Sequence, residues 1–127
     1  MSLRSPLGRA RGLGSAKDGV SHYNQQRLTA IALVPLSLWF VVSIISLIGA
    51  DYAHFHAWVA TPCNTAILLV LLFAVFHHVQ LGLQVVIEDY VHDEGVKSFS
   101  IVAVKFASVL VGVFSAVAVF RVAFVGG

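Results

Sequence analysis

The sequence predicts an all-α integral membrane protein with three transmembrane helices. Of its 127 residues, 58% are hydrophobic and only 11% are charged, and the mean hydropathy is +0.89, which is unusual for a soluble domain. Three long apolar segments cover about residues 28–48, 65–87 and 99–125. Each is long enough to cross about 30 Å of hydrocarbon at about 1.5 Å per residue. So short a chain has no polar block for a second core, and we expect one membrane bundle and no soluble catalytic domain.

A polar and basic stretch precedes the first apolar segment. Residues 1–26 are rich in Gly, Ser and Arg and contain no acid before Asp18. We interpret them as a flexible N-terminal arm on the aqueous side, followed by an anchor domain over residues 27–127. A transit peptide is the alternative. The arm is favoured because it runs directly into the first span, where its basic residues also serve as a topology signal.

The first span, about residues 28–48, contains no charged residue. Pro35 lies within it and is expected to bend the helix slightly. Membrane helices tolerate such a proline where a neighbouring hydroxyl satisfies the freed carbonyl group, and Thr29 or Ser37 is suited to this task. These three residues are therefore assigned packing roles.

The connection between the first two spans is polar and aromatic, which is typical of a short interfacial segment. Tyr52 and Trp58 are expected at headgroup level. His54 and His56 would point about 200° apart on a helix, so the polar face of an interfacial helix explains them better than a metal site. Cys63 is the only cysteine, which excludes an internal disulfide, and it is expected to be a small buried hydrophobe.

Basic residues predict the orientation of the spans. Five precede the first span, none lies between the first and second, Lys97 lies in the second connection, and Lys105 follows it. Lys105 and Arg121 are expected in the first and last turns of the third span, close enough to the interfaces to reach water. The N-terminus and the second connection, with Asp89 and Tyr90, are therefore predicted inside, and the C-terminus outside.

One stripe of the second span carries the candidate chemistry. Histidine within a membrane span is rare and costly to desolvate, so His78 is a functional candidate. Positions four, seven and eleven residues further on are Gly82, Val85 and Asp89, which form one stripe, since eleven steps bring the helix back to within roughly 20°. The stripe places an imidazole deep in the bilayer and a carboxylate about 16 Å away at the interface. Gly82 has no side chain to hold away a flat macrocycle or a neighbouring helix.

Haem ligation is the sharpest interpretation of this stripe. Neutral imidazole is a good axial ligand for haem iron, and a b-type haem can be held by one His from each of two helices. His78 is the one well-placed histidine, so the second ligand would come from another polypeptide. The alternative is that His78 only forms a hydrogen bond across a helix interface. His77 points about 100° away and is expected to form such a bond or to contact a haem edge, with ligation as its own alternative.

The motif His78-x-x-x-Gly82, followed after six residues by Asp89-Tyr90, resembles the signature of the hydrophobic anchor subunit of succinate dehydrogenase, respiratory complex II. The entry segment GVSHYNQQRLTAIAL, with Arg27 at the mouth of the first helix, is also similar to that family. The resemblance covers essentially the whole chain. It implies a membrane anchor in a bundle shared with a partner cytochrome b subunit, without catalysis by this chain alone.

The resemblance implies a role for each matching residue. His78 would be an axial ligand of haem b, opposite a His of the partner cytochrome b subunit. Tyr90 would donate a hydrogen bond to a ubiquinone carbonyl, and Asp89 would shape that site and take part in proton delivery. Arg27 would approach a haem propionate from the inside surface. The histidine found six residues before this arginine in some relatives is shifted here to His22, which we do not assign to the propionate.

The resemblance also implies partners and a location. Flavin and iron–sulfur clusters would belong only to the flavoprotein and iron–sulfur subunits, and the latter would supply the electrons. A net charge of +2 does not indicate nucleic acid. The compact arm favours the bacterial inner membrane, with a cytoplasmic N-terminus, over the mitochondrial inner membrane. The alternatives are the anchor of a fumarate reductase and a small His-containing membrane transport component; the latter is disfavoured because the spans carry no internal carboxylate.

Overall fold

The computed structural model describes residue 6 and residues 13–125. The helices of this part of the chain are α2 (Leu13–Ser46), α3 (Tyr52–Ala60), α4 (Pro62–Tyr90) and α5 (Glu94–Phe124). No strand occurs among the described residues. The predicted all-α fold is therefore confirmed.

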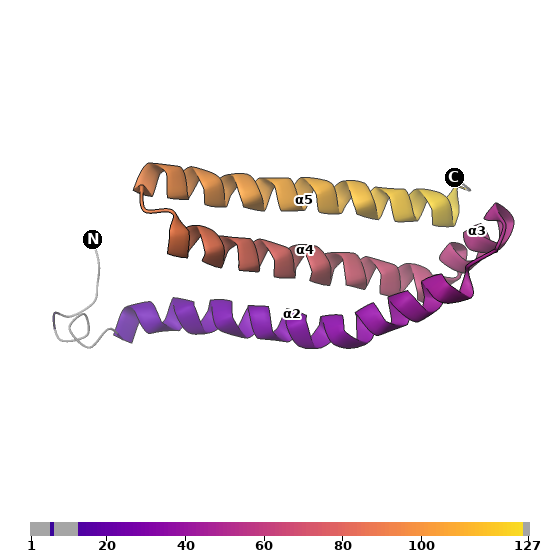
Figure 1. The fold of residues 1–127 in the computed structure, drawn as a ribbon, viewed down its shortest axis with the longest axis horizontal. Helices are drawn as coiled ribbons and strands as arrows, with labels where there is room; N and C mark the ends of the chain where they lie inside the picture. The colour runs from indigo at the N-terminus through magenta and orange to yellow at the C-terminus, as the bar shows by residue number, and fades with distance from the viewer. Residues whose placement is uncertain (1–5, 7–12, 126–127) are drawn as a thin grey trace.

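The three long helices lie side by side in a row (Figure 1). In the middle of the row, α4 lies between α2 and α5 and packs against both. At the end where α2 leads into α4, α3 packs against α4 and α5. The α4–α5 turn lies at the opposite end, which is also the end where α2 begins. The three passes therefore alternate in direction, as a protein with three membrane spans requires.

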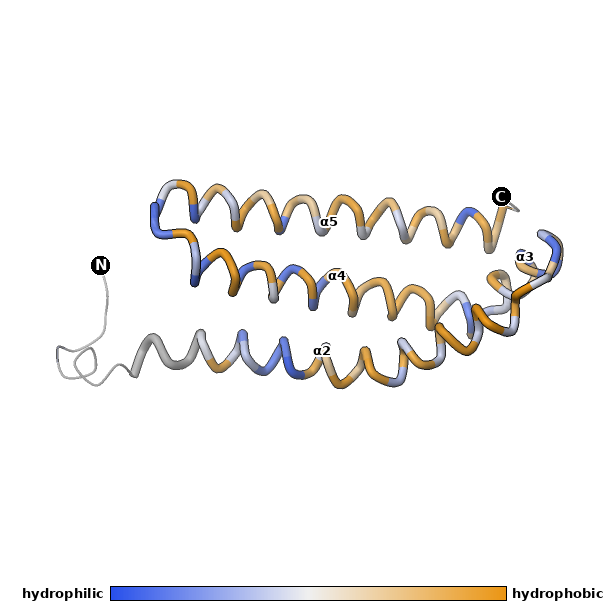
Figure 2. Tube along the Cα trace, in the orientation of Figure 1, coloured by the Kyte–Doolittle hydropathy of each residue, from blue (hydrophilic) through white to orange (hydrophobic). Residues whose placement is uncertain are grey.

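Three helical segments are long and apolar enough to cross a membrane: Gly19–Ser46, Pro62–Tyr90 and Glu94–Phe124. Figure 2 shows hydrophobic residues along all three, with hydrophilic residues gathered in the part of α4 near the α4–α5 turn and in the facing part of α2. Few side chains are buried, and α5 buries none. The chain is a multi-pass membrane protein whose apolar surface is left for lipid and for other chains.

α2 begins at Leu13, well before the predicted start of the first span. The prediction of a flexible arm up to Gln26 is therefore wrong from residue 13 on; apart from residue 6, the earlier part lies outside the described residues. Ala16, Lys17, Gln25 and Gln26 are good helix formers, and no proline interrupts residues 13–26. Pro35 lies inside α2, and Figure 1 shows the helix bending towards α3 beyond its middle.

The predicted interfacial segment is the short helix α3. It follows a turn at Gly49, whose φ of +83° favours glycine. Asp51 caps the helix by accepting a hydrogen bond from the His54 backbone N–H at 2.8 Å. Trp58 stacks on Trp39 of α2, with ring centroids 5.6 Å apart. These contacts hold α3 across one end of the row.

At this end of the molecule, the sequence disfavours a metal site at His54 and His56 and predicts that Cys63 is buried. Among the described residues, no three His, Cys, Asp or Glu side chains are grouped so as to hold a metal ion. His54 is exposed, and the ring of His56 lies near that of Tyr52, with centroids 6.1 Å apart. Cys63 is exposed, so its predicted burial is wrong for this chain. The reason is the row arrangement, which covers α4 on two sides only.

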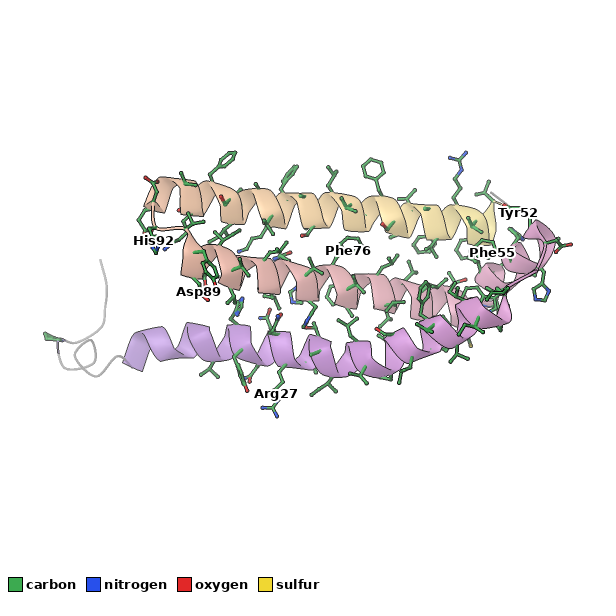
Figure 3. The ribbon with its side chains drawn as sticks, viewed as in Figure 1. Arg27, Tyr52, Phe55, Phe76, Asp89 and His92 are labelled. Atoms are coloured by element: carbon green, nitrogen blue, oxygen red, sulfur yellow. The ribbon has the colours of Figure 1, made fainter. Side chains whose placement is uncertain are left out.

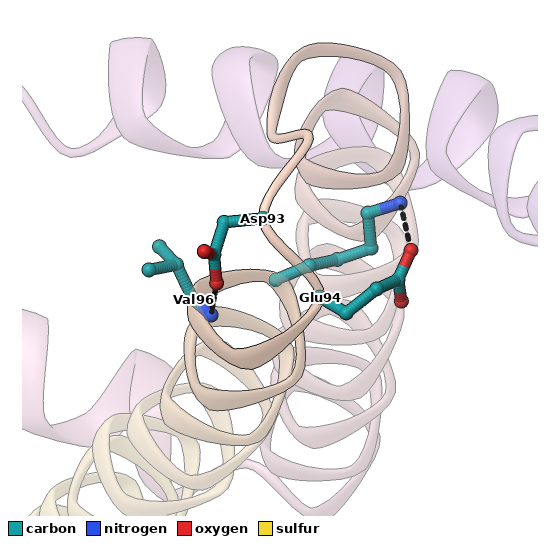
Figure 4. A network of polar contacts seen from close by, with 4 residues as sticks. Asp93, Glu94 and Val96 are labelled. Carbon is teal, nitrogen blue, oxygen red and sulfur yellow. Dashed lines mark hydrogen bonds and ion pairs between the residues drawn. The ribbon is translucent and has the colours of Figure 1, made fainter.

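α5 begins at Glu94, before the predicted start of the third span. Asp93 caps its first turn by accepting a hydrogen bond from the Val96 backbone N–H at 2.9 Å (Figure 4). The early start places Lys105 about 16 Å along the helix, so its predicted place in the first turn is wrong. Arg121 lies in the last turn, as predicted.

Candidate functional site

His78 lies within α4 on the side that faces α2. Its Nδ1 is 3.0 Å from Oγ1 of Thr29, a residue that is only 8% exposed. The same hydroxyl lies 3.0 Å from the carbonyl oxygen of Gln25 and 2.9 Å from that of Gln26. The predicted role of Thr29 beside Pro35 is therefore wrong, because its hydroxyl is turned back along α2 and towards His78. Sequence reasoning missed Thr29 as the partner of the imidazole.

The second ring nitrogen of His78, Nε2, has no hydrogen-bond partner within the described part of the chain. It is also not one of the buried polar atoms that lack a partner, which are His22 Nε2, Gln26 Oε1 and His56 Nε2. Nε2 is thus accessible, whereas Nδ1 is held by α2. An imidazole with one nitrogen anchored and the other accessible is arranged as histidine is when it binds a metal. The hydrogen bond across the helix interface and metal ligation are compatible, since they use different nitrogens.

His77 points to a different side of α4, where two neighbours hold it. Its Nε2 lies 3.2 Å from Oε1 of Gln25. Its ring stacks on Phe73, with centroids 5.6 Å apart and planes inclined by 12°. The predicted interhelical hydrogen bond of His77 is therefore confirmed. His77 and His78 each have one paired ring nitrogen, so it is the helix face that His78 shares with Gly82 and Asp89, and not the hydrogen bonding, that favours His78 as the metal ligand.

Gly82 lies where α4 approaches α2. A Cβ at this position would be 3.5 Å from Nε2 of Gln26, which is an ordinary van der Waals distance. Gly82 was predicted to give room to a flat macrocycle or to a neighbouring helix, and within this chain the neighbour is the helix α2. The Gln26 side chain fills that space, and its amide oxygen is buried without a hydrogen-bond partner.

Asp89 and Tyr90 form the C-terminal end of α4. Both side chains are exposed, that of Tyr90 by 77%. In Figure 3, Asp89 lies close to the α4–α5 turn that carries His92. The helix rise puts Asp89 about 16 Å from His78 along α4. The Asp89 carboxylate and the Tyr90 phenol are therefore adjacent in sequence and exposed, and they lie about half the thickness of the hydrocarbon core away from the His78 imidazole.

The structure does not bring Arg27 to His78. The Arg27 side chain is exposed and projects from α2 on the side away from α4 (Figure 3). Its Nη1 donates a hydrogen bond to the Tyr23 hydroxyl at 3.2 Å. A haem propionate would have to reach this outer side of α2 to meet the guanidinium, so the propionate contact stays a prediction.

Sequence reasoning also missed a polar pocket of about 270 Å³ lined from α2, α4 and α5. Its polar side chains include those of His22, Gln25, His77, Gln80, Gln84 and Lys105. A largely apolar groove of about 320 Å³ between α4 and α5 shares His77 and Gln80 with it. The signal was present in the sequence, because His77, Gln80 and Gln84 recur at helical spacing on one face of an apolar span.

Comparison with known proteins identifies the family of the chain. A family model described as the succinate dehydrogenase/fumarate reductase transmembrane subunit matches residues 1–112. The chain belongs to this family. The matched segment includes all of α2, α3 and α4 and therefore every candidate site residue from Arg27 to Tyr90.

Three relatives of the chain share the name of one kind of subunit. A succinate dehydrogenase hydrophobic membrane anchor subunit from Rickettsia bellii is 38% identical over 118 residues, covering 93% of this chain and 94% of the relative. The protein of the same name from Rickettsia conorii is 30% identical over 119 residues, with the same coverage. That from Paracoccus denitrificans is 28% identical over 90 residues, 71% of this chain and 70% of the relative. No solved structure matches the chain. The resemblance inferred from the His78 to Tyr90 motif is confirmed.

Proposed function

We propose that the chain is the membrane-anchor subunit of a succinate dehydrogenase, where it holds one side of haem b and contributes to the site at which ubiquinone is reduced. The observation that carries the proposal is the imidazole of His78, anchored at Nδ1 and accessible at Nε2, inside a span of a chain of this family. The names of the relatives favour succinate dehydrogenase over the fumarate reductase alternative. The lack of a carboxylate in the middle of the spans disfavours a transport component.

His78 would supply one axial ligand of haem b through Nε2, and a histidine of the partner cytochrome b subunit would supply the other. The ligand that this chain offers fits a haem shared between two chains, because such a site needs a single neutral imidazole from each chain. Haem provides one-electron redox capacity when bound. This chain holds the imidazole in place, Gly82 lets α4 lie close to α2 one turn further on, and Arg27 is proposed to meet a propionate that reaches the outer side of α2.

Asp89 and Tyr90 are proposed to serve ubiquinone. Quinone reduction takes up two electrons and two protons, so its proton donors must lie where water arrives. The phenol of Tyr90 would donate a hydrogen bond to a quinone carbonyl, and the carboxylate of Asp89 would shape the site and relay protons. Their exposure supports this role, because a site completed by an iron–sulfur subunit needs side chains that the anchor leaves uncovered.

Purification of the native complex by a tag on this chain tests the proposal as a whole. We expect a flavoprotein, an iron–sulfur protein and a second membrane subunit to purify with the chain, and the complex to have the absorption spectrum of low-spin b-type haem. Mass spectrometry and optical spectroscopy measure the two results. Isolation without a flavoprotein would contradict the assignment to succinate dehydrogenase, whereas a complete complex without haem would remove the haem role alone.

The proposed quinone site requires a defined topology in the bacterial inner membrane. The N-terminus and the α4–α5 turn, with Asp89 and Tyr90, should face the cytoplasm, because basic residues are concentrated before the first span. A phosphatase fused after α5 is expected to be active, since it would lie outside, and the same enzyme fused within the α4–α5 turn inactive. The reverse pattern would overturn both the topology and the location of the quinone site.

A further inference from the structure

The hydroxyl of Thr29 is in contact with three polar atoms. Its Oγ1 lies 3.0 Å from the Gln25 carbonyl oxygen, 2.9 Å from the Gln26 carbonyl oxygen and 3.0 Å from Nδ1 of His78. Thr29 is buried in the interface between α2 and α4. A hydroxyl has one proton to donate, and its lone pairs accept. The position of that proton therefore decides the direction of the bond to His78.

The two carbonyl contacts place the proton. A backbone carbonyl oxygen can only accept a hydrogen bond. Thr29 Oγ1 and a carbonyl oxygen 2.9–3.0 Å away therefore attract each other only when the hydroxyl proton lies between them. If the proton pointed to Nδ1 instead, the lone pairs of Oγ1 would face both carbonyl oxygens in a buried site, where such repulsion is poorly screened. The Thr29 proton is thus shared by the α2 carbonyls, and Oγ1 accepts a hydrogen bond from Nδ1–H of His78.

We infer that Thr29 is a positioning residue that fixes His78 as the neutral tautomer with its proton on Nδ1 and its lone pair on Nε2. This is the tautomer that can bind iron through the accessible nitrogen. The hydrogen bond also strengthens electron donation from the ring to a bound metal, because Oγ1 accepts better when its own proton is engaged. The inference rests on the proposed haem function and names the residue that prepares the ligand.

Two pairs of variants that differ in the hydroxyl test the inference in the purified complex: wild type against Thr29→Val, and Thr29→Ser against Thr29→Ala. Loss of the hydroxyl is expected to lower haem affinity about 10- to 100-fold, measured by transfer of haem to apomyoglobin. The haem midpoint potential should also rise, because a weaker imidazole donor stabilises ferric iron less. Thr29→Ser keeps the hydroxyl and should stay close to wild type in both measurements.

The outcomes separate this inference from the function on which it rests. A role of Thr29 in helix packing alone would lower the thermal stability of the complex and leave the midpoint potential unchanged, and that result in both hydroxyl-free variants would overturn the inference. The smaller Ser and Ala side chains keep the test valid if Thr29→Val does not assemble. If His78→Leu removes the low-spin haem and the Thr29 variants change nothing, only the tautomer inference fails. If His78→Leu leaves the haem unchanged, the proposed haem function fails.

Discussion

Replacing His78 with Leu is expected to abolish the low-spin haem spectrum of the purified complex. Iron that loses one of two axial imidazoles becomes high-spin, or the haem is not retained, because the number and identity of the ligands set the electronic state of the iron. Leu suits a membrane span better than His, so the variant chain should still insert. Optical and electron paramagnetic resonance spectra at equal protein concentration measure the change.

The matched control is the same substitution one residue earlier. His77 pairs with Gln25 through Nε2, so His77→Leu removes an interhelical hydrogen bond and should leave the low-spin spectrum in place. A low-spin spectrum kept by His78→Leu and lost in His77→Leu would exchange the roles of the two histidines. A low-spin spectrum in both variants would remove this chain from haem ligation.

Replacing Tyr90 with Phe is expected to reduce succinate:ubiquinone reductase activity tenfold or more while the haem content stays the same. The substitution keeps the ring and removes the phenolic donor. One hydrogen bond contributes about 0.5–1.5 kcal/mol net, and more where it strengthens as charge develops on the quinone oxygen. Since about 1.4 kcal/mol corresponds to tenfold in rate, a single lost donor accounts for an effect of this size.

The control for this variant is Tyr52→Phe, at the opposite end of the row in α3. It makes the same chemical change far from Asp89 and should leave quinone reduction close to wild type. Electron transfer from succinate to an artificial acceptor should be normal in both variants, which locates the Tyr90 defect at the quinone step. Unchanged quinone reductase activity in Tyr90→Phe would leave Tyr90 as an interfacial aromatic residue without a role in the reaction.

The helices of this chain were predictable because hydropathy reports directly on the membrane. A span needs about 20 apolar residues, so the three long helices stand out in the sequence. The helix ends were less predictable, because polar residues continue a helix beyond the hydrocarbon. α2 therefore extends back to Leu13, and α5 begins at Glu94, directly after its capping residue Asp93. The misplacement of Lys105 follows from the same cause.

The candidate site was predictable in part. His78 stood out because an imidazole is unusual in a span, but its partner Thr29 lies 49 residues away in the sequence. The contact between them depends on how α2 and α4 are packed together, and hydropathy carries no information about that packing. The family motif likewise gave the position of Arg27 along the chain but not the side of α2 from which it projects.

If the proposed partner subunits cover the row of α2, α4 and α5, the lifetime of this subunit would depend on their supply. α5 buries no residue, and the polar side chain of Gln80 lines a pocket where lipid offers it no hydrogen bond. In lipid, contacts with other chains must supply the packing that a closed bundle makes within itself. The population of the folded chain therefore rises with partner concentration by mass action. If the proposed subunits cover this surface, copies made in excess would stay accessible to membrane proteases, which would favour synthesis of the subunits in matched numbers.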